Sequence, residues 1–135
     1  MAHNTNKWLF IFCLFWLLPY TASSQDNRLK NITVNSIYDG DTFKITIPNT
    51  PAILGDKIAI RVRGIDAPEM RSKAQDEREK ARLSKQFTVA FLRSAKHIEL
   101  RNMKRGKYFR IIADVFADGK SLAEQLLLHK LAAPY

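Results

Sequence analysis

The chain has 135 residues, which suits a single domain, and its one cysteine excludes a scaffold held together by disulfides. Lys and Arg number 22 against 13 Asp and Glu, a formal net charge of +9. A positive excess of this size favours a polyanionic partner, either nucleic acid or an anionic lipid surface, although solubility alone also accounts for it.

Residues 1–24 differ in composition from the rest of the chain. An uninterrupted apolar run of 11 residues, Trp8 to Leu18, is followed by Pro19 and then by small residues. A helix of that length rises about 16 Å, well short of the roughly 30 Å hydrocarbon core of a membrane. The segment therefore predicts a signal peptide, residues 1–24, ahead of a domain at 25–135. We expect an exported protein, secreted or periplasmic. An uncleaved N-terminal anchor is the alternative.

The part of the chain after residue 30 begins with three predicted β-strands. Apolar and polar residues alternate over 32–38, 42–47 and 57–63, the period of two that is typical of a half-buried strand. Asp39-Gly40-Asp41 is a hairpin signal between the first two strands. We expect residues 25–29 to be frayed, and the proline-containing segment 48–56 to be a loop.

A long helix is predicted over residues 71–95. Its first half is almost entirely charged or small, so we expect solvent around it. Its second half carries an apolar stripe at the 3.6-residue spacing of a buried face, which we interpret as core. The stripe consists of Leu83, Phe87, Ala90, Phe91 and Ala95.

Two further strands and a short helix complete the domain. The strands are predicted at 98–101 and 108–116, on either side of a basic turn at 101–107. Ser121 and Glu124 form a capping box before a helix that turns Leu122, Leu126 and Leu127 inward. The order of elements predicts an α+β, mainly β fold. It is a five-stranded OB-type barrel with a helix between strands 3 and 4 and a short C-terminal helix.

The stretch from Arg61 to Glu69 combines residue types that suit a metal ion and a phosphate group. Asp66 and Glu69 lie three residues apart after a strand that carries Arg61 and Arg63. Carboxylate oxygens suit a hard metal ion, and guanidinium groups suit phosphate. Taken alone, the stretch also fits the solvated end of a strand, and Arg63 fits a solvated strand residue.

Three other short segments accompany this stretch. In chain order the set is Asp39-Gly40-Asp41-Thr42, Arg61 to Glu69, Lys107-Tyr108-Phe109-Arg110, and Ala117-Asp118-Gly119. Any one of them is a weak signal, but the ordered set is strong. In this order, and over nearly all of residues 32–135, the chain resembles the staphylococcal nuclease (thermonuclease) family.

The resemblance implies a calcium site. Asp41 and Asp66 resemble the two carboxylate ligands of Ca²⁺, and the backbone carbonyl of Ala67 resembles a third ligand. Glu69 resembles the residue that activates the attacking water. A cation held by two carboxylates keeps open positions for water and for a phosphate oxygen.

The resemblance also implies a substrate site. Arg61 and Arg110 resemble the pair that binds the phosphate, since forked guanidinium groups contact two phosphate oxygens at once. The remaining residues resemble those that hold the flanking nucleotide, namely Lys107, Tyr108 and Tyr135. For Tyr108, packing on the barrel is the alternative. Asp39 and Asp118 are expected to be turn residues only.

Together these roles imply an exported, calcium-dependent nuclease that cuts DNA and RNA with little sequence preference. We expect it to act as a monomer, without stable membrane insertion once the signal peptide is removed. The alternative is a non-catalytic nucleic-acid-binding barrel, because this fold also serves as a binding module. A basic membrane-surface protein is a weaker third possibility, because no basic amphipathic helix supports it.

Two positions depart from the family pattern. Phe109 and Lys130 stand where the family usually has glycine. If the backbone is left-handed at these positions, a side chain costs about 1–2 kcal/mol relative to glycine. The histidines at positions 3, 97 and 129 are scattered, which disfavours a zinc or histidine-metal nuclease.

Overall fold

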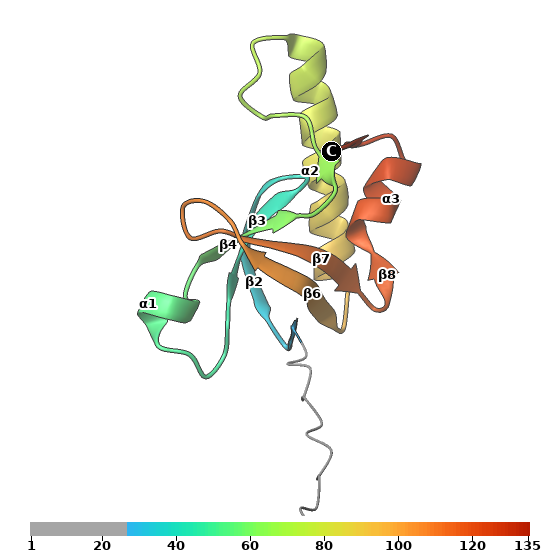
Figure 1. The fold of residues 1–135 in the computed structure, drawn as a ribbon. Helices are drawn as coiled ribbons and strands as arrows, with labels where there is room; N and C mark the ends of the chain where they lie inside the picture. The colour runs from blue at the N-terminus through green and yellow to red at the C-terminus, as the bar shows by residue number, and fades with distance from the viewer. Residues whose placement is uncertain (1–26) are drawn as a thin grey trace, which may run out of the picture.

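The computed structural model describes residues 27–135, which form a curled sheet with helices against it (Figure 1). The expected signal peptide and its cleavage site lie outside the described residues. Within 27–135, the structure has no helix long and apolar enough to cross a membrane.

The main sheet has seven strands in the order β1-β6-β7-β4-β3-β2, with β8 paired to β7. They are β1 (Arg28–Lys30), β2 (Thr33–Asp39), β3 (Thr42–Thr46), β4 (Ile58–Val62), β6 (Ile98–Arg105), β7 (Ile111–Ala117) and β8 (Lys120–Ser121). All neighbours are antiparallel except β4 and β7, which are parallel. Because the path ends at β1 and β2, the sheet is a partly open half-barrel, and the predicted OB-type fold is confirmed.

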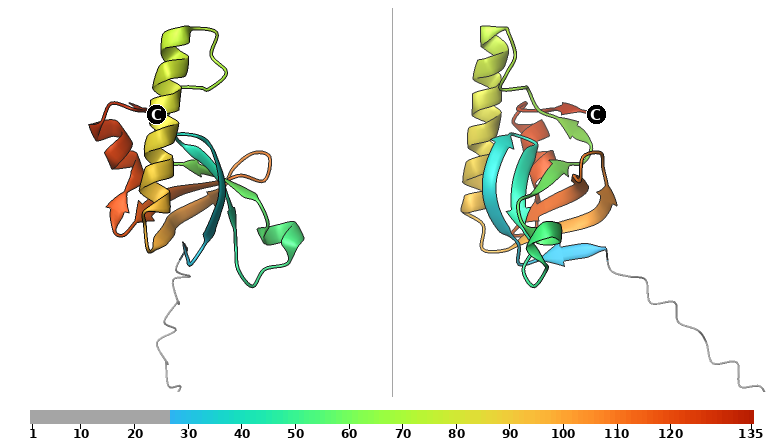
Figure 2. Two further views of the ribbon diagram at one scale, coloured as in Figure 1. Left: turned by 180° about the vertical axis from the view of Figure 1, so that it is seen from behind. Right: turned by 90° about the vertical axis from the view of Figure 1, so that its left-hand side faces the viewer.

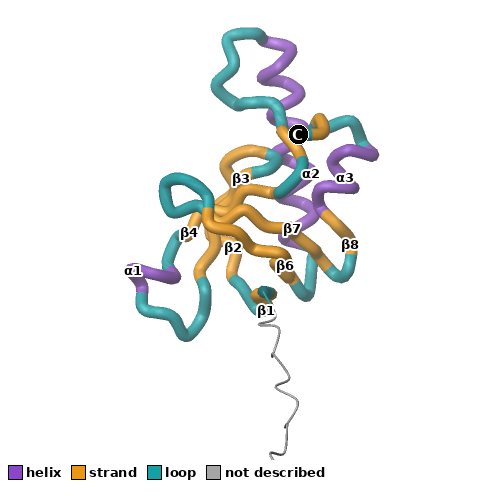
Figure 3. The backbone as a smooth tube through the Cα atoms, in the orientation of Figure 1, coloured by secondary structure: helices purple, strands orange, loops and turns teal. Residues whose placement is uncertain are grey.

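Three helices and a small second sheet surround this half-barrel (Figures 2 and 3). The helices are α1 (Ala52–Gly55), α2 (Gln75–Arg93) and α3 (Leu122–Leu128), and the small sheet pairs β5 (Ile65–Asp66) with β9 (Ala133–Pro134). The long helix α2 falls between β5 and β6, and α3 lies near the C-terminus, as the sequence predicts. The first turns of α2 and the loop before it extend away from the body (Figure 1).

The core lies inside the curl of the sheet. Alternate residues of β3 and β4 point inward, and Phe43, Ile45 and Ile60 have no exposed surface. From α3, Leu122 and Leu126 are likewise fully buried, which confirms the predicted inner face of that helix. The Ser121 hydroxyl accepts a hydrogen bond from the Glu124 backbone N–H at 3.3 Å, one half of the capping box.

Several predicted boundaries are wrong. Residues 28–30 are not frayed but pair with β6 as strand β1, and β6 in turn extends to Arg105 through the predicted basic turn. The last long strand begins at Ile111 rather than at 108, because Tyr108 and Phe109 have φ angles of 55° and 60°, which no strand accommodates. The predicted loop 48–56 contains the short helix α1.

The buried face of α2 also differs from the predicted stripe. Ala81, Ser84, Thr88 and Leu92 are buried, whereas Leu83 is 55% exposed. Phe87 and Phe91 stack on each other at 5.9 Å, and Phe87 also contacts His129 just after α3, so the stripe is only partly core.

The turn between β2 and β3 explains this orientation. A β-carbon on Gly40 would lie 1.9 Å from the Ser84 Oγ, so the helix approaches the turn as closely as a glycine allows. Thr88 Oγ1 donates a hydrogen bond of 2.6 Å to the Gly40 carbonyl. Small and hydroxyl-bearing residues therefore face the turn, while the large apolar residues point to the side.

Candidate active site

Asp41 lies in the two-residue turn between β2 and β3, against which α2 packs. Its side chain is only 1% exposed, and each carboxylate oxygen accepts a hydrogen bond. Oδ1 accepts from the Thr42 hydroxyl at 2.9 Å, and Oδ2 accepts from the Ala67 N–H at 2.6 Å. The Asp41 backbone carbonyl accepts from the Val62 N–H at 2.9 Å, which ties the turn to β4. Asp41 is therefore held rigidly by three different segments.

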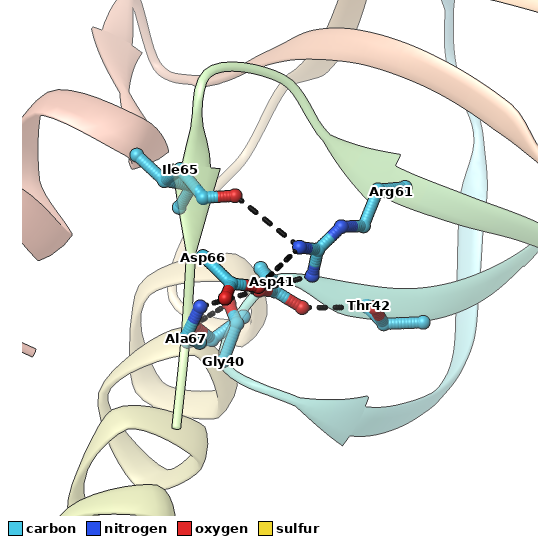
Figure 4. A network of polar contacts seen from close by, with 8 residues as sticks. Gly40, Asp41, Thr42, Arg61, Ile65, Asp66 and Ala67 are labelled. Carbon is cyan, nitrogen blue, oxygen red and sulfur yellow. Dashed lines mark hydrogen bonds and ion pairs between the residues drawn. The ribbon is translucent and has the colours of Figure 1, made fainter. Parts of the chain in front are cut away.

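Arg61 joins the two aspartates (Figure 4). Its guanidinium forms an ion pair with Asp41 Oδ2 and another, of 2.6 Å, with Asp66 Oδ1. Burial alone lowers the pKa of Arg61, but the hydrogen bond to Asp66 and the charge of Asp41 outweigh it and hold that pKa above its ordinary value. The two carboxylates thus converge on one cationic group.

Asp66 is positioned by the small second sheet. It lies on β5 opposite Ala133 of β9, and the Tyr135 N–H donates a hydrogen bond of 3.0 Å to the Gly64 carbonyl. Gly64 has a φ of 76°, so the turn into β5 needs a residue that tolerates the left-handed region. The C-terminal segment therefore braces the segment that carries one of the two aspartates.

These residues line a cleft of about 620 Å³. Eight of the nine predicted site residues contribute to it: Asp41, Arg61, Asp66, Ala67, Glu69, Lys107, Arg110 and Tyr135. The ninth, Tyr108, lies outside it and is 89% exposed, so the alternative that Tyr108 packs on the barrel is wrong. Residues from four distant parts of the sequence are thus brought to one cavity.

The far side of the cleft comes from the loop between β6 and β7. Lys107 and Arg110 lie there, and a 2.8 Å hydrogen bond from the Gly106 N–H to the Arg110 carbonyl fixes the loop. Among the described residues no carboxylate pairs with the Arg110 guanidinium, in contrast to Arg61. Glu69 lies exposed at the edge of the cleft, beyond Asp66. The arrangement places an uncommitted guanidinium and an exposed carboxylate in one cavity.

Asp39 is a cleft residue that the sequence interpretation assigned to the turn alone. One of its carboxylate oxygens, Oδ1, is buried without a hydrogen-bond partner among the described residues. Burial raises the pKa of Asp39 despite a hydrogen bond from the Met70 backbone, and the charges of Asp41 and Glu69 raise it further. The signal in the sequence was its position two residues before Asp41 on the same hairpin, which brings both ends of the turn to one place.

The structure also places three other residues whose interpretation the sequence left open. Arg63 lines the cleft but is not simply solvated, because it forms an ion pair of 3.6 Å with Asp114 and donates to the Asn102 carbonyl. Phe109 and Lys130 have φ angles of 60° and 56°, so both side chains do stand at left-handed positions.

The site offers a hard cation only a few side-chain ligands. Residues 27–135 hold no group of three or more His, Cys, Asp or Glu side chains arranged to bind a metal ion. Two carboxylates, from Asp41 and Asp66, nevertheless meet around the positive charge of Arg61, and the unpartnered Asp39 oxygen lies in the same cleft. Such a donor set suits a cation that takes its other ligands from backbone carbonyls, water or substrate.

The fold and the cleft together define a class: an OB-type barrel with a cleft that combines acidic residues and arginines. The family model described as staphylococcal nuclease homologue matches residues 59–135, and the chain belongs to that family. The chain is also 31% identical over 112 residues to the Endonuclease YncB of Bacillus subtilis (strain 168). This match covers 82% of the chain and 50% of the relative, so the chain spans about half the length of that protein.

Proposed function

We propose that this protein is a calcium-dependent nuclease that hydrolyses phosphodiester bonds of DNA and RNA with little sequence preference. The observation that carries the proposal is the single cleft that holds Asp41, Asp66 and Glu69 beside Arg61 and Arg110. Family membership supports it, as does the similarity to a protein named an endonuclease. A non-catalytic barrel has no need for an exposed carboxylate beside an unpaired guanidinium.

The chain's own residues divide the chemistry among them. Arg110 binds the phosphate and neutralises the charge that builds on its oxygens, and Lys107 holds the flanking nucleotide by its charge. Glu69 accepts a proton from the attacking water. Ca²⁺, held by Asp41, Asp66 and the Ala67 carbonyl, would supply Lewis-acid polarisation of a phosphate oxygen. Tyr108 and Tyr135, both almost fully exposed, are free to contact the flanking nucleotide.

Arg61 has to change partners to take part. Its guanidinium is committed to Asp41 and Asp66 here, the same two carboxylates that are proposed to hold the cation. If Asp41 and Asp66 held a divalent cation in place of the guanidinium, Arg61 would be free to bind a phosphate in the same cleft. We therefore propose that Arg61 balances the acidic charge in the metal-free protein and binds phosphate in the loaded one.

Weak sequence preference follows from the kind of contact that the cleft offers. Its positively charged residues are arginines and a lysine that suit phosphate oxygens, which carry no sequence information directly. Both DNA and RNA present these oxygens, so we propose that both are substrates.

The test is cleavage by the purified protein. Plasmid DNA and a structured RNA are incubated with Ca²⁺, and in parallel with a chelator in excess. We expect cutting of both polymers with Ca²⁺ and none with the chelator. Undiminished cutting in chelator would exclude the proposed role of Asp41 and Asp66. Binding without cutting under every divalent cation tried would favour the binding module instead.

We also propose that the protein is exported and acts as a monomer, without stable membrane insertion after the signal peptide is removed. The apolar run of residues 8–18 and the small residues after it support export. Intact-mass measurement of protein recovered from its native host should give a chain that starts near Gln25. Retention of residues 1–24 would favour the membrane-anchor alternative. Light scattering of the mature protein should give the mass of one chain.

A further inference from the structure

The loop between β6 and β7 ends in two exposed aromatic side chains. Tyr108 is 89% exposed and Phe109 is 66% exposed, although burial of such rings is ordinarily favourable. In Figures 1 and 3 this loop projects from the barrel on the same side as α1. The family resemblance implies that Tyr108 contacts the nucleotide. For Phe109 it implies no role, only a strained backbone.

Phe109 is costly in two ways. Its φ of 60° follows a φ of 55° at Tyr108, so two bulky residues in succession occupy a region that L-residues avoid. Its ring also faces solvent instead of the core. A glycine would avoid both costs. A strained and exposed residue beside a candidate active site motivates a functional hypothesis.

Basic residues contact the ring and flank it in the sequence. The Arg105 guanidinium lies 5.3 Å from the centre of the Phe109 ring, a cation–π contact. No acidic residue occurs between Met103 and Ile112, whereas four basic residues do. Lys107 and Arg110, on either side of Phe109 in the chain, also line the cleft. A nucleic-acid strand whose phosphate is bound in the cleft by these two residues would therefore run close to the loop that carries the ring.

We propose that Phe109 is a stacking site for an unpaired base of the substrate strand, and that it directs the enzyme toward single-stranded nucleic acid. Aromatic rings beside basic side chains bind single strands through base stacking and phosphate contacts. In a duplex, neighbouring base pairs cover the faces of each base, so the ring gains contact only where the strand is unpaired. The inference rests on the proposed nuclease function, because the cleft fixes where the strand runs.

The experiment measures binding rather than cutting. Fluorescence anisotropy is recorded in chelator at fixed salt, with a labelled 12-nucleotide single strand and with the matching duplex. Phe109→Leu keeps an apolar side chain at the strained position but removes the aromatic face. We expect it to weaken binding of the single strand roughly 5- to 100-fold and to leave binding of the duplex within about twofold. Phe109→Trp should restore binding of the single strand.

The outcomes separate this inference from the proposed function. If Phe109→Leu binds the single strand as tightly as the parent does, or loses single strand and duplex equally, stacking by Phe109 is excluded, whether or not the parent cuts nucleic acid. If the parent fails to cut with any divalent cation, the nuclease proposal fails, and the comparison of the two variants still decides whether the ring stacks on bases. The dependence of log affinity on log salt should be the same for parent and Phe109→Leu, because no charge is removed.

Discussion

Single residues at the cleft have roles that substitution can separate. Glu69 is exposed at its edge and forms no ion pair among the described residues, and Arg110 lines the same cleft with a guanidinium that pairs with no carboxylate of residues 27–135. One carries out proton transfer in the proposed mechanism, and the other stabilises charge. Their substitutions should therefore change rate and affinity differently.

Glu69→Gln keeps the shape of the side chain and removes the base. If Glu69 activates water, the rate at saturating substrate should fall by about 10² to 10⁴. Affinity for nucleic acid should hold or increase slightly, because a negative charge near the phosphate is gone. Cleavage kinetics beside a binding titration at fixed salt measures both quantities. Cutting as fast as the parent would show that Glu69 is not the general base.

Arg110→Ala is the matched comparison. It removes charge stabilisation in the transition state together with part of the ground-state contact to phosphate, so rate and affinity should both fall. A variant that lost affinity alone would place Arg110 in substrate binding without a part in the chemistry.

The left-handed backbone at Phe109 also leads to a prediction about stability. Phe109→Gly relieves a left-handed φ at an exposed site and should stabilise the fold by about 1 kcal/mol, raising the melting temperature by several degrees. Phe109→Ala retains a β-carbon and should give little or no gain. A melting temperature for the glycine variant at or below that of the alanine variant would show that the position is not strained. The stacking proposal adds that this more stable variant binds single strands less tightly.

At the scale of elements, the sequence predicted the order of the long strands and helices but not their exact faces and ends. The period of two was sufficient to predict the buried faces of β3 and β4, because alternate residues there are fully buried. The face of α2 was not predictable from apolar spacing, because its contact with Gly40 selects small residues such as Ser84 over large ones. The start of β7 was displaced by two left-handed residues, a backbone feature that the family pattern raised for Phe109 but that nothing in the sequence indicated for Tyr108.

The turn between β7 and β8 makes a contact with another segment that the sequence pattern did not predict. Asp118, expected to be a turn residue only, accepts hydrogen bonds from the Lys96 N–H at 3.1 Å and from the His97 N–H at 2.8 Å. It therefore ties this turn to the segment between α2 and β6. Both hydrogen bonds lower the pKa of Asp118 below its ordinary value of 3.8. The bond from the His97 backbone has the larger effect and the bond from the Lys96 backbone the smaller.

A pH dependence follows from that shift. Because the pKa is lower in the folded state than in the unfolded state, the ionised carboxylate stabilises the fold above the ordinary pKa, and this contribution is lost as the pH falls through the folded-state value. Asp118→Asn tolerates the same left-handed turn but removes the charge. It should lower the melting temperature at pH 7. The difference from the parent should shrink as the pH falls below 3.8. A constant difference across the titration would mean that ionisation of Asp118 contributes nothing.

At the scale of the whole molecule, the cleft is a product of topology. The pairing of β3 with β4 brings Asp41 beside Arg61, and the parallel pairing of β4 with β7 brings the Arg110 segment beside β4. The pairing of β5 with β9 brings the C-terminal segment to Asp66, although these segments are far apart in the chain. The sequence supplied the residues of the site through a family pattern. It did not supply the partners of Arg61, because the ion pairs with Asp41 and Asp66 depend on the register of β3 against β4, which sets Thr42 opposite Arg61, and on the turn at Gly64.

The positive charge of the whole molecule leads to a prediction about how binding depends on salt. Asp and Glu are outnumbered by Lys and Arg, 13 to 22. The cleft contains Arg61, Lys107 and Arg110, and Lys104 lies outside it near the end of β6. If about four of these cations contact phosphates, log affinity for a single strand should fall linearly with log salt with a slope near −3. Lys104→Gln, which removes a charge on β6 just before the loop and outside the cleft, should reduce the steepness by about 0.7. Anisotropy titrations at five salt concentrations measure both slopes. A slope near zero in the parent would show that phosphate contacts do not dominate binding, and an unchanged slope in Lys104→Gln would place the strand away from the loop.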